Sequence, residues 1–179
     1  AHEVQGVGRV LHVAQQLVAG DAGLAGLLAD VKAVLEAAFG QLGDDHELTF
    51  DDVRKILDDS VSFKPRRQMV VQYSGGEPTM SPHFLEACAY AKKIGYTLVQ
   101  AATNGLRFAI EPEFAFQAKE AGLDMVYLQF DGTTNESNAH RHITNLFDVR
   151  KVAIDNLAAA GIRITPVVTV LNGVNNHQV

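Results

Sequence analysis

Residues Gln72 to Met80 read Q-Y-S-G-G-E-P-T-M, and they follow an apolar run that starts at Met69. The run is short and rich in β-branched residues, which is typical of a buried strand. Two glycines, a carboxylate and a proline at its end allow two interpretations. One is a tight turn, because glycine tolerates positive φ and proline stops a strand. The other is a ligand cradle, in which Gly75 and Gly76 expose their backbone and Glu77 accepts hydrogen bonds from an ammonium group.

Three further apolar runs resemble the first and alternate with helical patterns. The predicted strands are Met69 to Tyr73, Thr97 to Ala102, Met125 to Phe130 and Ile162 to Val170. The predicted helices are Pro82 to Ile94, Glu111 to Ala121 and Leu146 to Ala160. Gly95, Gly122 and Gly161 fall where these helices are expected to end. The alternation predicts an α/β fold with a buried parallel sheet, either an open doubly wound sheet or a complete or partial β/α barrel.

The residues before this repeat follow a helical pattern. From Val4 to about Leu42 the apolar residues recur at helical spacing, which predicts one or two helices. Thr49 followed by acidic residues predicts the N-cap of another helix. We therefore divide the chain into a helical leader, residues 1–46, and an α/β core, residues 47–179.

The composition favours a globular cytoplasmic protein. A chain of 179 residues with 47% hydrophobic content can bury one sizeable core. The net charge of -6 argues against an electrostatic nucleic-acid or membrane surface. No apolar run approaches the roughly 20 residues that span a bilayer. We expect a cytoplasmic protein with a small-molecule ligand, no nucleic-acid partner and no membrane span.

Polar residues at the strand ends form the candidate site. The carboxyl ends of parallel strands share one edge, where α/β proteins bind ligands. The four predicted strands are followed there by S-G-G-E-P, T-N-G, Q-F-D-G and L-N-G-V-N-N. One such group is typical of a turn, whereas four at one edge favour a site for a small polar ligand. Gln129 and Asp131 are expected to accept hydrogen bonds from ribose hydroxyls, and the alternative for Glu77 is an acid at the start of the next helix.

Two other features are assigned no function. The sequence H-R-H at His140 to His142 offers two metal ligands without a third nearby, so we expect solvated side chains. Cys88 is the only cysteine and falls on the apolar face of its predicted helix, so we expect a small buried hydrophobe. A single cysteine also excludes an internal disulfide and a metal site built from several thiolates.

The motifs S-G-G-E-P-T, A-T-N-G and Y-L-Q-F-D-G resemble those of the radical S-adenosylmethionine (SAM) superfamily in order and spacing. The resemblance covers about Leu48 to Val179 and is nearest to the branch that includes tetraether lipid synthase. It implies a partial (β/α)6 barrel in which the amino group of SAM lies on the G-G-E motif. The residues that it places around SAM and the substrate are Gly75, Gly76, Glu77, Thr103, Asn104, Gln129 and Asp131.

The resemblance also implies a four-iron four-sulfur cluster, a 5′-deoxyadenosyl radical and a lipid-like substrate. The family places a C-x3-C-x2-C motif before the G-G-E strand, but no cysteine precedes Gln68 here. We therefore expect that the cluster of a full-length relative does not bind this chain, and that the chain is an internal fragment or a degenerate copy, inactive as it stands. The alternatives are a non-catalytic module that binds SAM or a nucleoside or acts as a scaffold, and a doubly wound nucleotide binder unrelated to radical chemistry.

Overall fold

The computed structural model describes residues 26, 48–63, 69–141, 143 and 145–177. Apart from residue 26, the predicted helical leader lies outside the described residues. In chain order the elements are α3 Phe50–Ser62, β1 Val70–Tyr73, the 3-10 helix η2 Pro78–Met80, α4 Phe84–Ile94, β2 Leu98–Thr103, α5 Leu106–Ile110, α6 Pro112–Glu120, β3 Met125–Gln129, the 3-10 helix η3 Glu136–Arg141, α7 Leu146–Ala159 and β4 Arg163–Val167. The predicted alternation of strands and helices is confirmed.

The ends of the first two helices follow from local chemistry. Thr49 and Asp52 form a capping box at the start of α3, because the Thr49 hydroxyl accepts from the Asp52 N–H at 3.2 Å and the Asp52 carboxylate accepts from the Thr49 N–H at 3.1 Å. Helix α4 ends at Gly95, whose φ of 105° is in the left-handed region that favours glycine. Both boundaries were predicted from the sequence.

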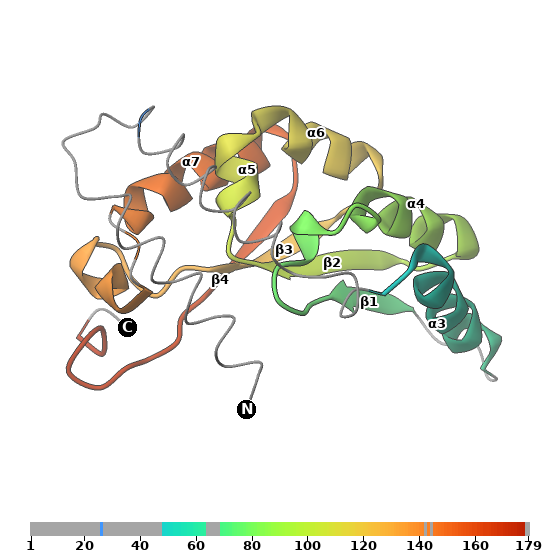
Figure 1. Cartoon of the computed structure of the whole chain (residues 1–179), viewed down its shortest axis with the longest axis horizontal. Helices are drawn as coiled ribbons and strands as arrows, with labels where there is room; N and C mark the ends of the chain where they lie inside the picture. The colour runs from blue at the N-terminus through green and yellow to red at the C-terminus, as the bar shows by residue number, and fades with distance from the viewer. Residues whose placement is uncertain (1–25, 27–47, 64–68, 142, 144, 178–179) are drawn as a thin grey trace.

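The four strands form one parallel sheet in the order β1-β2-β3-β4 (Figure 1). Their register aligns Tyr73, Ala101, Val126 and Ile164 in one row. All four side chains of this row belong to the hydrophobic core or pack against it. The α/β prediction is therefore confirmed, and the sheet is consistent with a partial β/α barrel of the radical SAM type.

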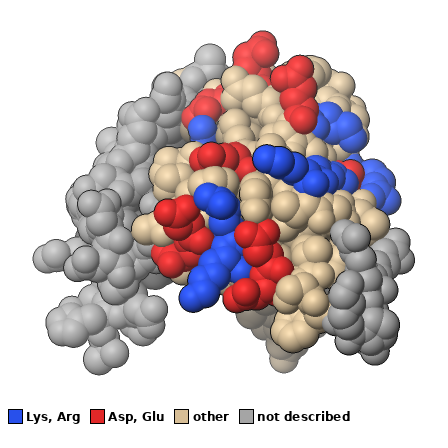
Figure 2. All heavy atoms as spheres, turned by 90° about the vertical axis from the view of Figure 1, so that its right-hand side faces the viewer, with Lys and Arg blue, Asp and Glu red and all other residues tan. Residues whose placement is uncertain are grey.

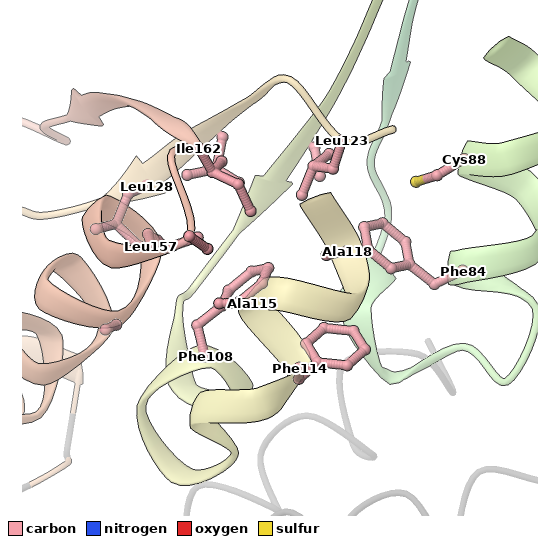
Figure 3. Packing of buried hydrophobic residues seen from close by; sticks show 14 of the residues in the cluster. Phe84, Cys88, Phe108, Phe114, Ala115, Ala118, Leu123, Leu128, Leu157 and Ile162 are labelled. Atoms are coloured by element: carbon pink, nitrogen blue, oxygen red, sulfur yellow. The ribbon is translucent and has the colours of Figure 1, made fainter. Parts of the chain in front are cut away.

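The core lies between this face of the sheet and the helices that cover it. Phe114 of α6 packs against Phe84 of α4 and Phe108 of α5, with ring centroids 6.0 and 5.3 Å apart (Figure 3). Cys88 is fully buried in the same cluster, as predicted. Aromatic rings from three helices thus fix the helical layer over the sheet.

The opposite face of the sheet, called the polar face below, combines polar side chains with apolar ones such as Val70 and Val167. Helices α4 to α7 lie on one face (Figure 1), and the row of side chains on the other face is Gln72, Gln100, Met125 and Arg163. Parallel sheets with both faces covered are apolar on both sides. The prediction of strands buried on both faces is wrong for the edge strands β1 and β4, where Val70 is 49% and Val167 is 42% exposed.

Two local features differ from the sequence prediction. Strand β4 ends at Val167 instead of Val170, because the Thr169 N–H donates to the side chain of Asp131 instead of a neighbouring strand. The short helix α5 was not predicted, and its first N–H, that of Leu106, donates to the Asn104 side chain at 2.9 Å. In both places a side chain after a strand takes the backbone hydrogen bond.

Charges of both signs are mixed on the face that carries α3 and α4 (Figure 2). The Arg54 guanidinium lies 3.4 Å from the Asp51 carboxylate on α3, and both side chains are exposed. Pairs of this kind contribute little to stability. Among the described residues, no helix has the length and apolar character needed to cross a membrane.

Candidate functional site

The loop after β1 presents an open stretch of backbone. Gly75 has a φ of +146°, which residues with a side chain rarely adopt, and both Gly75 and Gly76 are exposed. A Cβ added to either glycine would have no heavy atom within 4 Å. A ligand can therefore approach the N–H and C=O groups of this loop closely.

Glu77 joins this loop to the end of the neighbouring strand. Its Oε1 accepts hydrogen bonds from the Thr103 hydroxyl at 2.7 Å and from the Thr79 hydroxyl and N–H at 2.7 and 3.2 Å. Its Oε2 accepts from the Asn104 N–H at 2.7 Å. The structure thus brings together Glu77, Thr103 and Asn104, which the sequence placed at two strand ends, and Glu77 also caps the short helix η2.

The loop after β2 is held by its own side chains. The Thr103 hydroxyl accepts from the Gly105 N–H at 3.0 Å while it donates to Glu77. Thr103 is only 5% exposed, whereas Asn104 is half-buried. Thr103 therefore positions the carboxylate of Glu77, and Oε2 of Glu77 keeps room for a second donor because each carboxylate oxygen can accept more than one hydrogen bond.

Asp131 organises the ends of β3 and β4 from a fully buried position. Its φ is 57°, which is unusual for a residue with a side chain. Oδ2 accepts from the Arg141 Nε–H at 2.7 Å, and Oδ1 accepts from the Thr169 N–H at 2.9 Å. Burial raises the pKa of Asp131, but the hydrogen bonds from Arg141 and Thr169, together with the positive charges of Arg141 and Arg150, hold the pKa below its ordinary value of 3.8.

Asn175 extends this arrangement to the segment after β4. Asn175 is fully buried, and its Nδ2 donates to the backbone oxygens of Asp131 and Thr169 at 2.7 and 2.8 Å. The L-N-G-V-N-N motif follows β4, as expected, and its Asn175 also contacts the residue Asp131 that follows β3. Its Asn175 side chain satisfies two backbone carbonyl groups at this edge of the sheet.

Arg150 is the main residue of this region that the sequence analysis missed. It is 1% exposed and donates to Gln129 Oε1 at 3.1 Å, to the Phe130 carbonyl at 3.0 Å and to Asn138 Oδ1. Burial lowers its pKa from 12.5 to about 10. The available signal was its spacing, because Arg150 falls on the same face of α7 as the buried Ala153 and Leu157.

His140 also differs from its prediction as a solvated residue. Both ring nitrogens are buried and have no hydrogen-bond partner within the described structure, and Nε2 lies 3.6 Å from Asp131 Oδ2. His142 lies outside the described residues. No group of three His, Cys, Asp or Glu side chains suited to a metal ion occurs among the residues that the structure describes.

A parallel sheet with exposed glycine backbone and a carboxylate at its carboxyl edge defines a β/α protein, the class in which ligands bind at the strand ends. Residues 31–179 match the family described as the Radical SAM superfamily. The chain therefore belongs to the radical SAM superfamily. Members of this superfamily use SAM and a four-iron four-sulfur cluster.

Relatives with several different names share this region. The chain is 30% identical to 7,8-dihydro-6-hydroxymethylpterin dimethyltransferase of Methanocaldococcus jannaschii over 76% of this chain and 27% of that protein. It is 32% identical to Fe-coproporphyrin III synthase of Methanosarcina barkeri over 67% of this chain and 29% of that protein. It is 34% identical to the mycofactocin maturase MftC of Mycobacterium tuberculosis over 70% of this chain and 32% of that protein. The chain thus spans less than two thirds of the length of each.

The residues of this chain do not fit the family's cluster. Cys88 is the only cysteine in the sequence, and it lies fully buried on helix α4. Burial raises the pKa of the Cys88 thiol to about 12, which opposes the thiolate that an iron ligand requires. The 179 residues therefore hold no set of thiolates that could bind the cluster.

Proposed function

We propose that the carboxyl edge of β1 and β2 is the SAM-binding part of a radical SAM enzyme. The observation that carries the proposal is the hydrogen bonding of Glu77 to both Thr103 and Asn104 beside the open backbone of Gly75 and Gly76. This geometry fixes a carboxylate next to accessible N–H and C=O groups. The amino-acid end of SAM offers an ammonium group and a carboxylate, which are complementary to such a surface.

Each predicted residue has a distinct part in this proposal. Gly75 and Gly76 let the methionine moiety approach the backbone, and Glu77 Oε2 accepts from its ammonium group. Thr103 and Asn104 act as positioning residues, because their hydrogen bonds hold the Glu77 carboxylate. This edge supplies binding and orientation.

Gln129 and Asp131 are proposed for the ribose side of the site. Gln129 is half-buried, and its Oε1 already accepts from Arg150, so its amide N–H groups are the donors offered to a ribose hydroxyl. Asp131 is fully buried with both carboxylate oxygens bonded. We therefore assign Asp131 the role of a positioning residue, which holds Arg141 and the backbone of Thr169 in place and does not contact the ligand.

The substrate is proposed to be polar. The second face of the sheet carries Gln72, Gln100 and Thr165, and relatives are named for a pterin, a coproporphyrin and GTP. The lipid-like substrate of the tetraether-synthase branch is the competing candidate. It is favoured by the exposed Val70 and Val167 at the two edges of the same sheet.

A non-catalytic SAM-binding or scaffold module is the second candidate function. The single, buried Cys88 favours it, because three thiolates are needed beside the SAM site for the chemistry of the family. Anaerobic reconstitution with iron and sulfide tests the premise that both candidates share, namely that this chain alone holds no cluster. A stoichiometric cluster on this chain alone would contradict the assignment that the chain lacks cluster ligands.

Calorimetric titration with SAM tests the binding proposal. In the Gly76→Ala variant an added methyl group meets open space in the fold, so we expect unchanged stability and at least tenfold weaker SAM binding. The matched control is Ala158→Ser, which adds one atom at an exposed position of α7. Equal SAM affinities for the two variants, or no binding of millimolar SAM by the unmodified chain, would overturn the proposal.

A further inference from the structure

Gln100 is a buried polar residue near the middle of the sheet. Its neighbours along β2, Val99 and Ala101, are fully buried in the core between sheet and helices. Because side chains alternate along a strand, Gln100 projects from the polar face. Gln100 itself is 8% exposed and lies on an interior strand between β1 and β3.

The amide of Gln100 is satisfied at one end only. Its Nε2 donates to Gln72 Oε1 on the neighbouring strand at 3.0 Å. Its Oε1 is buried and accepts no hydrogen bond within the described structure. Buried amide oxygens in folded proteins are normally paired, because an unpaired one keeps the cost of its lost hydration. Gln100 Oε1 is therefore an acceptor for which the described residues supply no donor.

We propose that Gln72 and Gln100 form a recognition pair for an N–H donor on the substrate. An N–H group on the polar face of the sheet pairs with Gln100 Oε1, and the exposed amide of Gln72 offers N–H groups to an adjacent carbonyl. The pair thus selects a substrate that carries N–H donors over a hydrocarbon chain, which cannot donate to Oε1.

The position of the pair also bounds the size of the substrate. Gln100 precedes Thr103 by three residues on β2, which corresponds to about 10 Å along the strand. A substrate held by the pair and reaching the SAM edge therefore extends roughly that distance. This inference rests on the proposed function for the placement of SAM, but the chemistry of the pair does not depend on it.

Uracil and 1,3-dimethyluracil test the proposal as a matched pair of probes. The two rings have the same core, but only uracil carries N–H donors. We expect the side-chain amide signals of Gln100, in NMR spectra of the ¹⁵N-labelled full chain, to shift saturably with uracil. The apparent affinity for 1,3-dimethyluracil is expected to be at least tenfold weaker. Equal responses to the two probes, or no Gln100 response to uracil, would overturn the proposal.

Two variants separate recognition from a change in fold. Gln100→Met keeps the size of the side chain but removes the acceptor and the Gln100 amide signals. The readout for the variants is therefore the side-chain amide signals of Gln72, whose shift with uracil is expected to be lost. Gln117→Met makes the same change at an exposed position of α6, and its uracil response is expected to match that of the unmodified chain. Loss of the response in both variants, or retention in both, would contradict the assignment to Gln100.

A SAM titration of the same sample distinguishes this inference from the proposed function. SAM binding together with equal responses to the two probes would overturn the recognition pair and leave the SAM site in place. Discrimination between the probes without SAM binding would overturn the SAM site and support the pair. The two claims therefore fail independently.

Discussion

The hydroxyl of Thr103 donates a hydrogen bond of 2.7 Å to the carboxylate of Glu77. The two residues are 26 positions apart and lie just after β1 and at the end of β2, which are parallel neighbours. The same hydroxyl accepts from the Gly105 N–H. One buried threonine thus couples the glycine loop after β1 to the loop after β2, and the proposed ligand edge depends on that coupling.

Thr103→Val is expected to destabilise the protein by about 1–3 kcal/mol, because the Glu77 carboxylate and the Gly105 N–H each lose a partner. The midpoint of urea unfolding measures this loss. Thr97→Val is the control, since the Thr97 hydroxyl donates to the Met69 carbonyl at an exposed site where water can replace it. Equal costs at the two positions would show that the Thr103 hydroxyl has no special role.

Gly105→Ala is expected to cost more stability than Gly161→Ala. Both glycines have left-handed φ, 80° and 71°, so each substitution carries a backbone cost of about 1–2 kcal/mol. At Gly105 a Cβ would also lie 2.5 Å from Cδ1 of the buried Leu128, whereas at Gly161 it meets open space. We expect an additional 1–3 kcal/mol, as an order of magnitude, for overpacking at Gly105. Chemical unfolding of both variants measures the difference, and equal losses would contradict the close packing.

Asp131→Asn is expected to change the acid dependence of stability. The pKa of Asp131 in the folded protein is below the ordinary 3.8, so its contribution is present above about pH 4 and is lost as the pH falls through the folded-state pKa. In Asp131→Asn this carboxylate is missing, so the free energy of unfolding is expected to fall less steeply as the pH is lowered. At neutral pH the variant is expected to be about 3 kcal/mol less stable, because the buried Arg150 loses its neighbouring negative charge.

Unfolding midpoints between neutral pH and the acid limit of the fold test this prediction. Asp155→Asn removes a charge at an exposed position of α7 and serves as the control for stability at neutral pH. Parallel pH curves for the unmodified chain and Asp131→Asn would contradict the prediction.

The thiol of Cys88 is expected to be unreactive in the folded chain. Burial raises its pKa to about 12, and the side chain is 0% exposed. Because it is the only cysteine, a colorimetric thiol reagent at mildly alkaline pH should report close to zero equivalents in native buffer and one equivalent in denaturant. Rapid stoichiometric reaction of the native chain would show that Cys88 is accessible and reopen its role as a ligand.

The sequence predicted the features that depend on hydrophobic periodicity and on the residues that begin and end helices. The capping residue Thr49 and the left-handed Gly95 located helix ends, and the order of strands and helices located the edge that carries Glu77, Thr103 and Asn104. Local patterns cannot show which distant groups meet. Contacts between separate elements bury Arg150 and supply both hydrogen bonds to the Asp131 carboxylate. Such contacts also leave Gln100 Oε1 without a hydrogen-bond donor among the described residues.

The most direct test of the central claim compares SAM with 5′-methylthioadenosine, which shares the nucleoside but lacks the amino-acid end. We predict by calorimetry that the unmodified chain binds SAM at least tenfold more tightly, since a charge-assisted hydrogen bond contributes about 1.5–3 kcal/mol. In Glu77→Gln this preference should shrink, whereas in the exposed control Glu120→Gln it should persist. Equal affinity of the unmodified chain for the two compounds, or an unchanged preference in Glu77→Gln, would contradict the account.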